Sequence, residues 1–69
     1  MSDHVYKSIE ITGTSKENIE DAVSKALKKA ATSVHNLRWF EVTDVRGAVD
    51  GDKVGQWQVT VKIGFTLDD

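Results

Sequence analysis

The sequence predicts a small α+β domain whose elements follow the order β-α-β-β. Apolar and polar residues alternate over residues 5–12, as is typical of a strand. Apolar residues then recur every three or four positions over residues 19–34, which indicates an amphipathic helix. Alternation returns on both sides of Asp50-Gly51, a dipeptide that is favoured in tight hairpin turns. One strand, one helix and a closing hairpin follow from these three patterns.

The predicted helix begins at a capping box. Thr14-Ser15-Lys16-Glu17 follows Gly13, and in such a box the Thr14 hydroxyl accepts a hydrogen bond from a first-turn N–H while the Glu17 carboxylate accepts one from the Thr14 N–H. No proline interrupts the helical pattern. The apolar face that we expect the helix to bury consists of Ile19, Ala22, Val23, Ala26, Leu27, Ala30, Ala31 and Val34.

The hairpin is predicted from two runs of alternating residues, 37–49 and 54–67, with Asp50 and Gly51 as the loop. The expected pairs on one face are Trp39 with Lys62, Glu41 with Thr60, Thr43 with Gln58 and Val45 with Gln56, and those on the other are Phe40 with Val61 and Val42 with Val59. We expect the helix to cover the face that carries Phe40. Because neighbours on a strand point to opposite faces, Trp39 is predicted to point away from the helix.

Length and composition limit what the protein can be. The chain has 69 residues and no cysteine, so neither disulfides nor thiolate metal sites can stabilise it, and we expect a single domain over residues 1–69 that gains buried area by subunit association. Nine basic and eleven acidic residues give a net charge of -2, which does not favour binding to nucleic acid. The start of the chain does not have the pattern of a signal peptide and no apolar run is long enough to span a membrane, so a cytoplasmic location is expected.

The outward Trp39 is the main candidate for a functional residue. A tryptophan on an open sheet face has two interpretations: an anchor of a subunit contact, or a platform on which a planar ligand stacks. Gln56 and Gln58 are predicted on the same face. The Gln58 amide offers a donor and an acceptor on one side chain, which suits the edge of a heterocycle, although a solvated strand residue is the other interpretation.

Arg46-Gly47 is the second candidate. An arginine can hold a phosphate, and glycine lets the backbone come close to a ligand. Strict alternation places Arg46 on the helix-facing side, so this role requires a bulge in the strand or a position at the rim of the sheet. A salt bridge between Arg46 and Asp44 or Glu41 is the structural alternative.

Catalytic and metal sites are not predicted. His4 and His35 are far apart in the sequence and have no metal-ligand spacing. Ser8, Ser24 and Ser33 have no histidine base beside them in the sequence, so no nucleophile is assembled. We therefore expect that the protein is not an enzyme.

The whole chain resembles the dodecins, small flavin-binding proteins of bacteria and archaea. The resemblance is carried by five motifs, which are Gly13-Thr14-Ser15, Leu37-Arg38-Trp39-Phe40-Glu41-Val42, Val45-Arg46-Gly47, Trp57-Gln58 and Gly64-Phe65-Thr66-Leu67. It implies a three-stranded antiparallel sheet wrapped on one long helix, and twelve subunits closed into a hollow shell.

The resemblance also implies a ligand. Two flavins would stack between the tryptophans of two subunits related by a two-fold axis. Trp39 would be the stacking residue, and Gln58 would bond the pyrimidine edge of the isoalloxazine ring. Arg46 matches an arginine that bacterial members place near the flavin phosphate, which is consistent with FMN, and riboflavin is the other candidate.

The sequence departs from the bacterial pattern at two positions. Thr66 stands where several bacterial relatives have arginine, and Trp57 where they usually have tyrosine or phenylalanine. Bacterial members can also hold coenzyme A at a separate surface site, and Lys7 and Lys29 are the positions here that such a site would use.

Three functional hypotheses follow. The leading one is flavin storage and protection, in which an indole in contact with an excited flavin donates an electron and takes it back. The second is a flavin-dependent enzyme, and the third is a structural assembly module in which Trp39 is a subunit contact.

Overall fold

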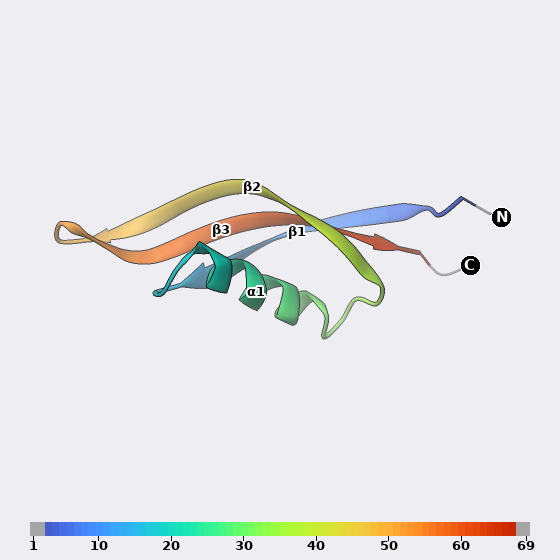
Figure 1. Ribbon diagram of the computed structural model, residues 1–69, viewed down its shortest axis with the longest axis horizontal. Coiled ribbons are helices and arrows are strands. Elements are labelled where there is room, and N and C mark those ends of the chain that lie inside the picture. The colour runs from blue at the N-terminus through green and yellow to red at the C-terminus, as the bar shows by residue number, and fades with distance from the viewer. Residues whose placement is uncertain (1–2, 68–69) are drawn as a thin grey trace.

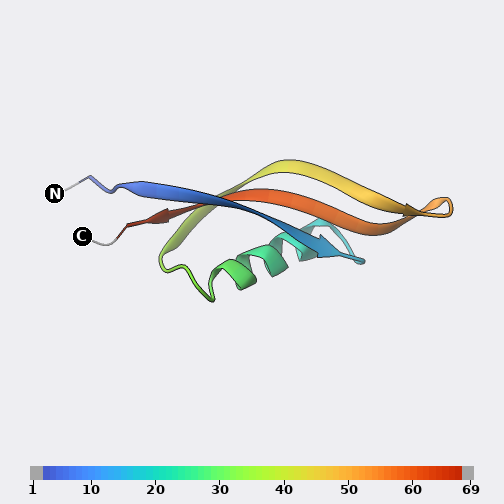
Figure 2. The same cartoon turned by 180° about the vertical axis from the view of Figure 1, so that it is seen from behind.

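The computed structural model describes residues 3–67. Within that range the elements are β1 (Tyr6–Ser15), α1 (Ile19–Ala30), β2 (Leu37–Asp50) and β3 (Lys53–Thr66), which confirms the predicted order β-α-β-β. The sheet is antiparallel throughout, and β3 lies between β1 and β2 (Figures 1 and 2). The molecule is elongated, with extents of 55 × 20 × 13 Å, because the β2–β3 hairpin runs well beyond α1.

The helix begins later than the predicted capping box. Asn18 is the N-cap residue, and its Oδ1 accepts a hydrogen bond from the Asp21 N–H at 2.7 Å. Strand β1 continues through Thr14 to Ser15, so Thr14 pairs with Gln58 in the sheet instead of capping the helix. The capping-box prediction was wrong because the same short motif also suits the end of a strand.

Ser15 joins β1 to the helix. Its hydroxyl oxygen accepts hydrogen bonds from the N–H groups of Glu17 and Asn18 at 2.9 and 3.3 Å. The hydroxyl also donates to the Asp21 carboxylate at 2.6 Å. This bond, followed by the contact with Lys25, lowers the pKa of Asp21 from its ordinary value. The turn is thus held by a buried side chain that the sequence pattern did not single out.

The helix also ends earlier than the apolar spacing predicts. Its last residue is Ala30, and Ala31 is the C-cap, with its N–H donating to the Leu27 carbonyl at 2.9 Å. Ala31 and Val34, which were predicted on the buried helical face, therefore lie beyond the helix. Asn36 then adopts a φ of 63°, a left-handed conformation that turns the chain into β2.

A seam of small and branched side chains joins α1 to the sheet. The buried residues are Ala22, Val23, Ala26 and Ala30 of the helix and Val59, Val61 and Ile63 of β3. Gly13 of β1 lies against this seam, and a Cβ at that position would collide with the backbone carbonyl of Ala22. Alanines on the helix and glycine on the strand let the two backbones approach closely.

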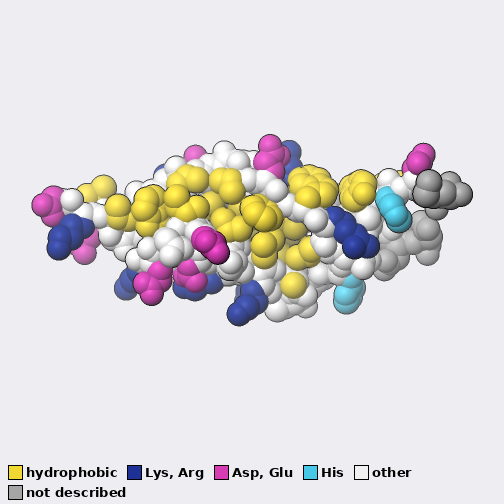
Figure 3. Space-filling view, viewed as in Figure 1, with side chains coloured by type: hydrophobic (Ala, Val, Ile, Leu, Met, Phe, Trp, Pro, Cys, Tyr) yellow, Lys and Arg dark blue, Asp and Glu magenta, His cyan; other side chains and the backbone are white. Residues whose placement is uncertain are grey.

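The helix leaves part of its own side of the sheet uncovered. It packs mainly on β1 and β3, whereas Phe40, Val42 and Val45 of β2, which we call the β2 flank, stay 41–48% exposed. Their partners in the register are Ile63, Val61 and Val59, so they point to the same side as the core. Apolar side chains form a band along the hairpin beside α1 (Figure 3). The helix therefore packs on the predicted face of the sheet, but it leaves Phe40 and Val42 of that face partly exposed.

At Trp39, the hairpin register differs from the predicted register by two residues. The loop residues are Gly51 and Asp52, not Asp50 and Gly51, because Asp50 pairs with Lys53. Trp39 accordingly lies opposite Gly64 instead of Lys62. An even shift moves partners along the strand but keeps each side chain on its face, so the predicted orientation of Trp39 is confirmed.

A β-bulge changes the alternation in the middle of β2. The register shifts between Val42 and Asp44, which leaves Thr43 as the extra residue. Beyond it, Val45 lies opposite Val59 on the helix side, and Arg46 lies opposite Gln58 on the other. Both residues were predicted on the reverse faces, because strict alternation does not anticipate a bulge.

The helix cap can be tested by comparing two alanine variants. Asn18→Ala should lower the free energy of unfolding by about 1 kcal/mol, because the Asp21 N–H loses its acceptor. Thr14→Ala, at the cap predicted from the sequence, should cost clearly less. Urea unfolding followed by circular dichroism at one protein concentration measures both, and a larger loss for Thr14→Ala would contradict the observed cap.

Candidate functional site

The outer face of the sheet is the side that points away from α1. It consists of rows of cross-strand neighbours that follow one another along β3. In order, these rows are Tyr6 and Thr66; Ser8, Gly64 and Trp39; Glu10, Lys62 and Glu41; Thr12, Thr60 and Asp44; Thr14, Gln58 and Arg46; and Gln56 with Ala48. The face is polar apart from the Tyr6 and Trp39 rings at one end and Ala48 at the other.

Trp39 lies across the strand from Gly64 and covers it. A Cβ at Gly64 would collide with Cε2, Cζ2 and Nε1 of the indole, so the ring occupies the space in which any other residue would place its side chain. Gly64 is buried as a result, while Trp39 itself remains 42% exposed. One aromatic surface is thus supported by the backbone of β3 and the rest is open.

Arg46 and Gln58 form a second polar group on the outer face. The Thr43 bulge brings Arg46 opposite Gln58, which is the condition under which Arg46 was predicted to contact a ligand. The Arg46 side chain is 74% exposed, and its Nε lies 3.9 Å from Oδ2 of Asp44. Gln58 is half-buried between Arg46 and Thr14 of the flanking strands. The predicted salt bridge and an open guanidinium therefore coexist.

The two groups lie far apart in one chain. Gln58 and Gly64, the partner of Trp39, are six residues apart on β3, which corresponds to about 20 Å along a strand. A glutamine side chain and half of a tricyclic ring, placed end to end, are together shorter than this distance. One subunit does not bring Trp39 and Gln58 to the same ligand.

The centre of the outer face is tied together by hydroxyl groups. The Thr12 and Thr60 hydroxyl oxygens are 2.8 Å apart, which joins β1 to β3. The Thr43 hydroxyl lies 3.2 Å from both the Glu10 carboxylate and the Thr60 carbonyl, so the bulged residue contacts β3 and reaches across to β1. These contacts fix the position from which Asp44 and Arg46 project.

The remaining predicted residues are distributed differently. Gln56 is half-buried on the outer face, two positions from Gln58. Lys7 is exposed opposite Phe65 and so points to the helix side, and Lys29 is exposed in the last turn of α1. Neither lysine joins the outer-face group, and their contact with coenzyme A stays a prediction.

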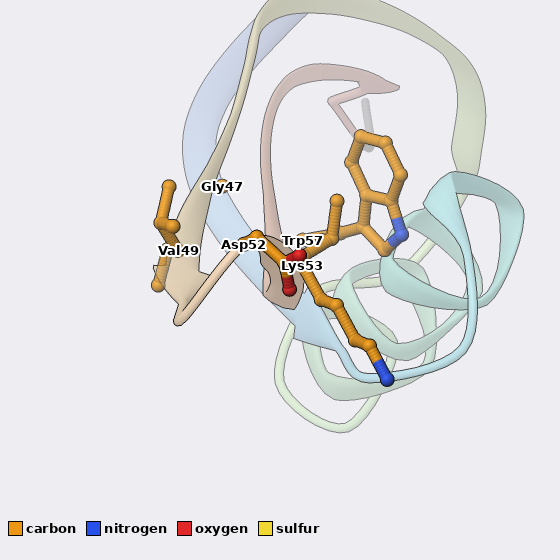
Figure 4. Close-up of a pocket in the computed structure, with 7 residues that line it drawn as sticks. Gly47, Val49, Asp52, Lys53 and Trp57 are labelled. Atoms are coloured by element: carbon orange, nitrogen blue, oxygen red, sulfur yellow. The ribbon is translucent and has the colours of Figure 1, made fainter.

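A groove lies at the hairpin end, on the helix side of the sheet. This groove of about 340 Å³ is lined by Gly47, Ala48, Val49, Asp52, Lys53, Val54 and Trp57 (Figure 4). Trp57 is half-buried and pairs with Gly47. The second tryptophan of the chain therefore lies on the face opposite to Trp39 and takes no part in the outer-face site.

Several site residues were missed by sequence reasoning. In the sequence, Gly64 stands out only as part of a motif. A glycine within a strand indicates that another group approaches the backbone closely, so this position could have indicated a ring that covers it. Asp44 and Thr43 owe their place to the bulge, for which the sequence gives no signal of its own. Among residues 3–67, no three histidine or acidic side chains gather to hold a metal ion, and no helix there is long and apolar enough to cross a membrane.

Comparison with known proteins agrees with this fold. The dodecin family model matches residues 5–68. The chain is 40% identical over 65 residues to the dodecin of Thermus thermophilus, which covers 94% of each chain. A solved dodecin from Streptomyces coelicolor superimposes with a TM-score of 0.93 at 42% identity and covers 100% of this chain and 99% of that one.

A more distant relative has calcium in its name. The calcium dodecin of Mycobacterium tuberculosis is 32% identical over 63 residues, which covers 91% of this chain and 89% of its own, and its structure superimposes with a TM-score of 0.80. Solved structures of the T. thermophilus dodecin include variants in which a tryptophan or one of two arginines is replaced.

The contact between Trp39 and Gly64 predicts the effect of one methyl group. In a Trp57→Phe background, Gly64→Ala should displace the indole from the strand, so Trp39 emission should shift to the red and be quenched more readily by acrylamide. Gly51→Ala is the control for backbone strain, because its φ of 66° disfavours alanine while no atom lies within 4 Å of the added methyl group, so Trp39 emission should not change. Unchanged Trp39 emission in Gly64→Ala would contradict the observed packing.

Proposed function

The chain belongs to the dodecin family, and on that premise we propose that it binds flavin, FMN or riboflavin, and stores it in a photochemically protected form. The observation that carries the proposal is Trp39, whose indole lies over Gly64 on a polar face and stays 42% exposed. A supported aromatic surface of this kind suits a planar aromatic ligand.

Stacking supplies affinity without chemistry. Each aromatic contact contributes about 0.5–1.5 kcal/mol beyond the buried area. The Trp39 ring is held by a strand backbone, so little of its freedom remains to be lost when a flavin stacks on it. An electron-rich indole in contact with an excited flavin can donate an electron and recover it, which returns the flavin unreacted.

The site requires two copies of the chain. Trp39 and the Gln58–Arg46 group are about 20 Å apart within one subunit, so a flavin centred on the indole does not reach Gln58 of the same chain. Two outer faces related by a two-fold axis would bring Trp39 of one copy toward Gln58 of the other. Gln58 would then bond the pyrimidine edge of the ring, with Arg46 and Gln56 beside it.

The β2 flank supports further association. Phe40, Val42 and Val45 are apolar, contiguous and 41–48% exposed, and surfaces of this kind mark protein contacts. Because they lie on the face opposite to Trp39, one subunit can use the outer face for a two-fold pair and the β2 flank for other neighbours. We propose that these contacts close a hollow shell of twelve subunits, located in the cytoplasm.

Storage is favoured over catalysis and over a purely structural role. Flavins stacked between two indoles leave no open ring face for a substrate. A subunit anchor alone does not require the neighbouring strand to carry glycine beneath the ring. Calcium is not proposed, because residues 3–67 bring no three acidic side chains together.

Quenching of flavin fluorescence tests the proposal directly. Added protein should reduce FMN or riboflavin emission to a small fraction of that of the free flavin. Trp39→Ala should weaken binding roughly two- to tenfold, through the loss of one stacked face, and should raise the emission of the bound flavin. Trp57→Phe, on the opposite face, is the matched control and should quench normally.

The alternatives give different results in the same assay. Bright flavin emission at saturating protein would reject flavin storage. A colourless protein whose oligomeric size is unchanged in Trp39→Ala, with no flavin binding, would indicate the structural module. Catalytic turnover of NADH with bound flavin would indicate the enzyme.

Mixing two weakened variants tests the shared site. Trp39→Ala retains Gln58, and Gln58→Ala retains Trp39, so a mixed two-fold pair rebuilds one complete site from two chains. Refolding the variants together should restore about a quarter of the native high-affinity sites, whereas each variant refolded alone restores none. No recovery in the mixture would show that each site lies within a single chain.

A further inference from the structure

We propose that the outer face selects an uncharged flavin, of which riboflavin is the simplest, over the phosphorylated FMN, and that Asp44 is the residue that decides this preference. The inference rests on the proposed flavin site and specifies its ligand. Riboflavin and FMN present the same ring to Trp39 and Gln58, so stacking and edge contacts are equal for both. The terminal phosphate alone distinguishes them.

The outer face carries more negative than positive charge. Its rows contain the carboxylates Glu10, Glu41 and Asp44 but only the cations Lys62 and Arg46. At the hairpin end, Asp50 and Lys53 lie opposite one another and cancel. When two outer faces meet around one site, the excess of negative charge doubles.

The cations near the candidate site are already matched. Arg46 lies 3.9 Å from Asp44, and Lys62 sits between Glu10 and Glu41 in the register. A phosphate at Arg46 would bring about two negative charges next to the Asp44 carboxylate, which is 56% exposed and points the same way. The guanidinium therefore gives a phosphate less net attraction than an isolated arginine would.

One further cation, Arg38, lies beside Trp39 at the border of the outer face. Thr66, the next outward residue of β3 after Gly64, is neutral and buried. Arg38 adjoins Trp39 in the chain, falls at a register shift between Leu37 and Trp39, and lines a hollow with Leu27, Leu37, Trp39 and Phe40. An FMN phosphate directed toward the Arg46 end of the outer face thus meets a guanidinium that already faces Asp44.

The bulge is what makes Asp44 decisive. Without the extra residue Thr43, Asp44 and Arg46 would both fall on the helix side, where strict alternation predicts them. The bulge turns both together, so the arginine that could bind a phosphate always arrives with the carboxylate that opposes it.

Titration of both flavins into the same protein tests the inference. In wild-type protein at low salt, riboflavin should bind roughly two- to fivefold more tightly than FMN, the range expected from one exposed charge interaction. Asp44→Asn should remove that preference or reverse it by a similar factor. Glu20→Gln, which makes the same change of charge on the exposed side of α1, should leave the ratio of the two affinities unchanged.

Salt provides an independent measurement. Raising the ionic strength toward 1 M shortens the Debye length to about 3 Å, so the affinities for riboflavin and FMN should converge in wild-type protein and also in Asp44→Asn if that variant reverses the preference. Tighter binding of FMN than of riboflavin at low salt, or a ratio that Asp44→Asn does not change, would overturn the inference while leaving flavin storage intact. Failure of both flavins to bind would reject the proposed function itself, and with it the inference.

Discussion

One helix has to cover a sheet much larger than itself, and this constraint shapes the rest of the molecule. The helix has 12 residues and is about 18 Å long, whereas β2 and β3 have 14 residues each and extend over about 45 Å. It therefore protects β1 and β3 and leaves the β2 flank and the hairpin end exposed. A chain of this size without cysteine completes its core by association.

The outer face is organised by two departures from regular strand structure. Gly64 removes a side chain from β3, and the Trp39 ring fills that space. Thr43 inserts a residue into β2, which turns Asp44 and Arg46 outward together. Gly64 thus makes room for an exposed aromatic ring, and the Thr43 bulge places the charges of Asp44 and Arg46 on the same face. The proposed preference for an uncharged flavin depends on both.

Distance within the subunit links assembly to binding. Trp39 and Gln58 are on the same face but about 20 Å apart, so the proposed ligand site does not exist in an isolated chain. In the proposed site, flavin binding and two-fold pairing are coupled, because a ligand that contacts two copies stabilises their contact. The opposite face remains available for the other contacts of a closed shell.

Local pattern determined the types of element, their order and the face of Trp39. Each of these depends on periodicity along the chain, and the orientation of Trp39 survives a register error because that error is even. Tertiary structure decided where α1 begins, because the pairing of Thr14 with Gln58 extends β1 to Ser15 and leaves Asn18 to cap the helix. It also decided the uncovered β2 flank, the outward turn of Arg46 and the separation of Trp39 from Gln58. These three features depend on the length of the helix relative to the strands and on the extra residue Thr43 in β2. The spacing of neighbouring side chains encodes neither of these causes.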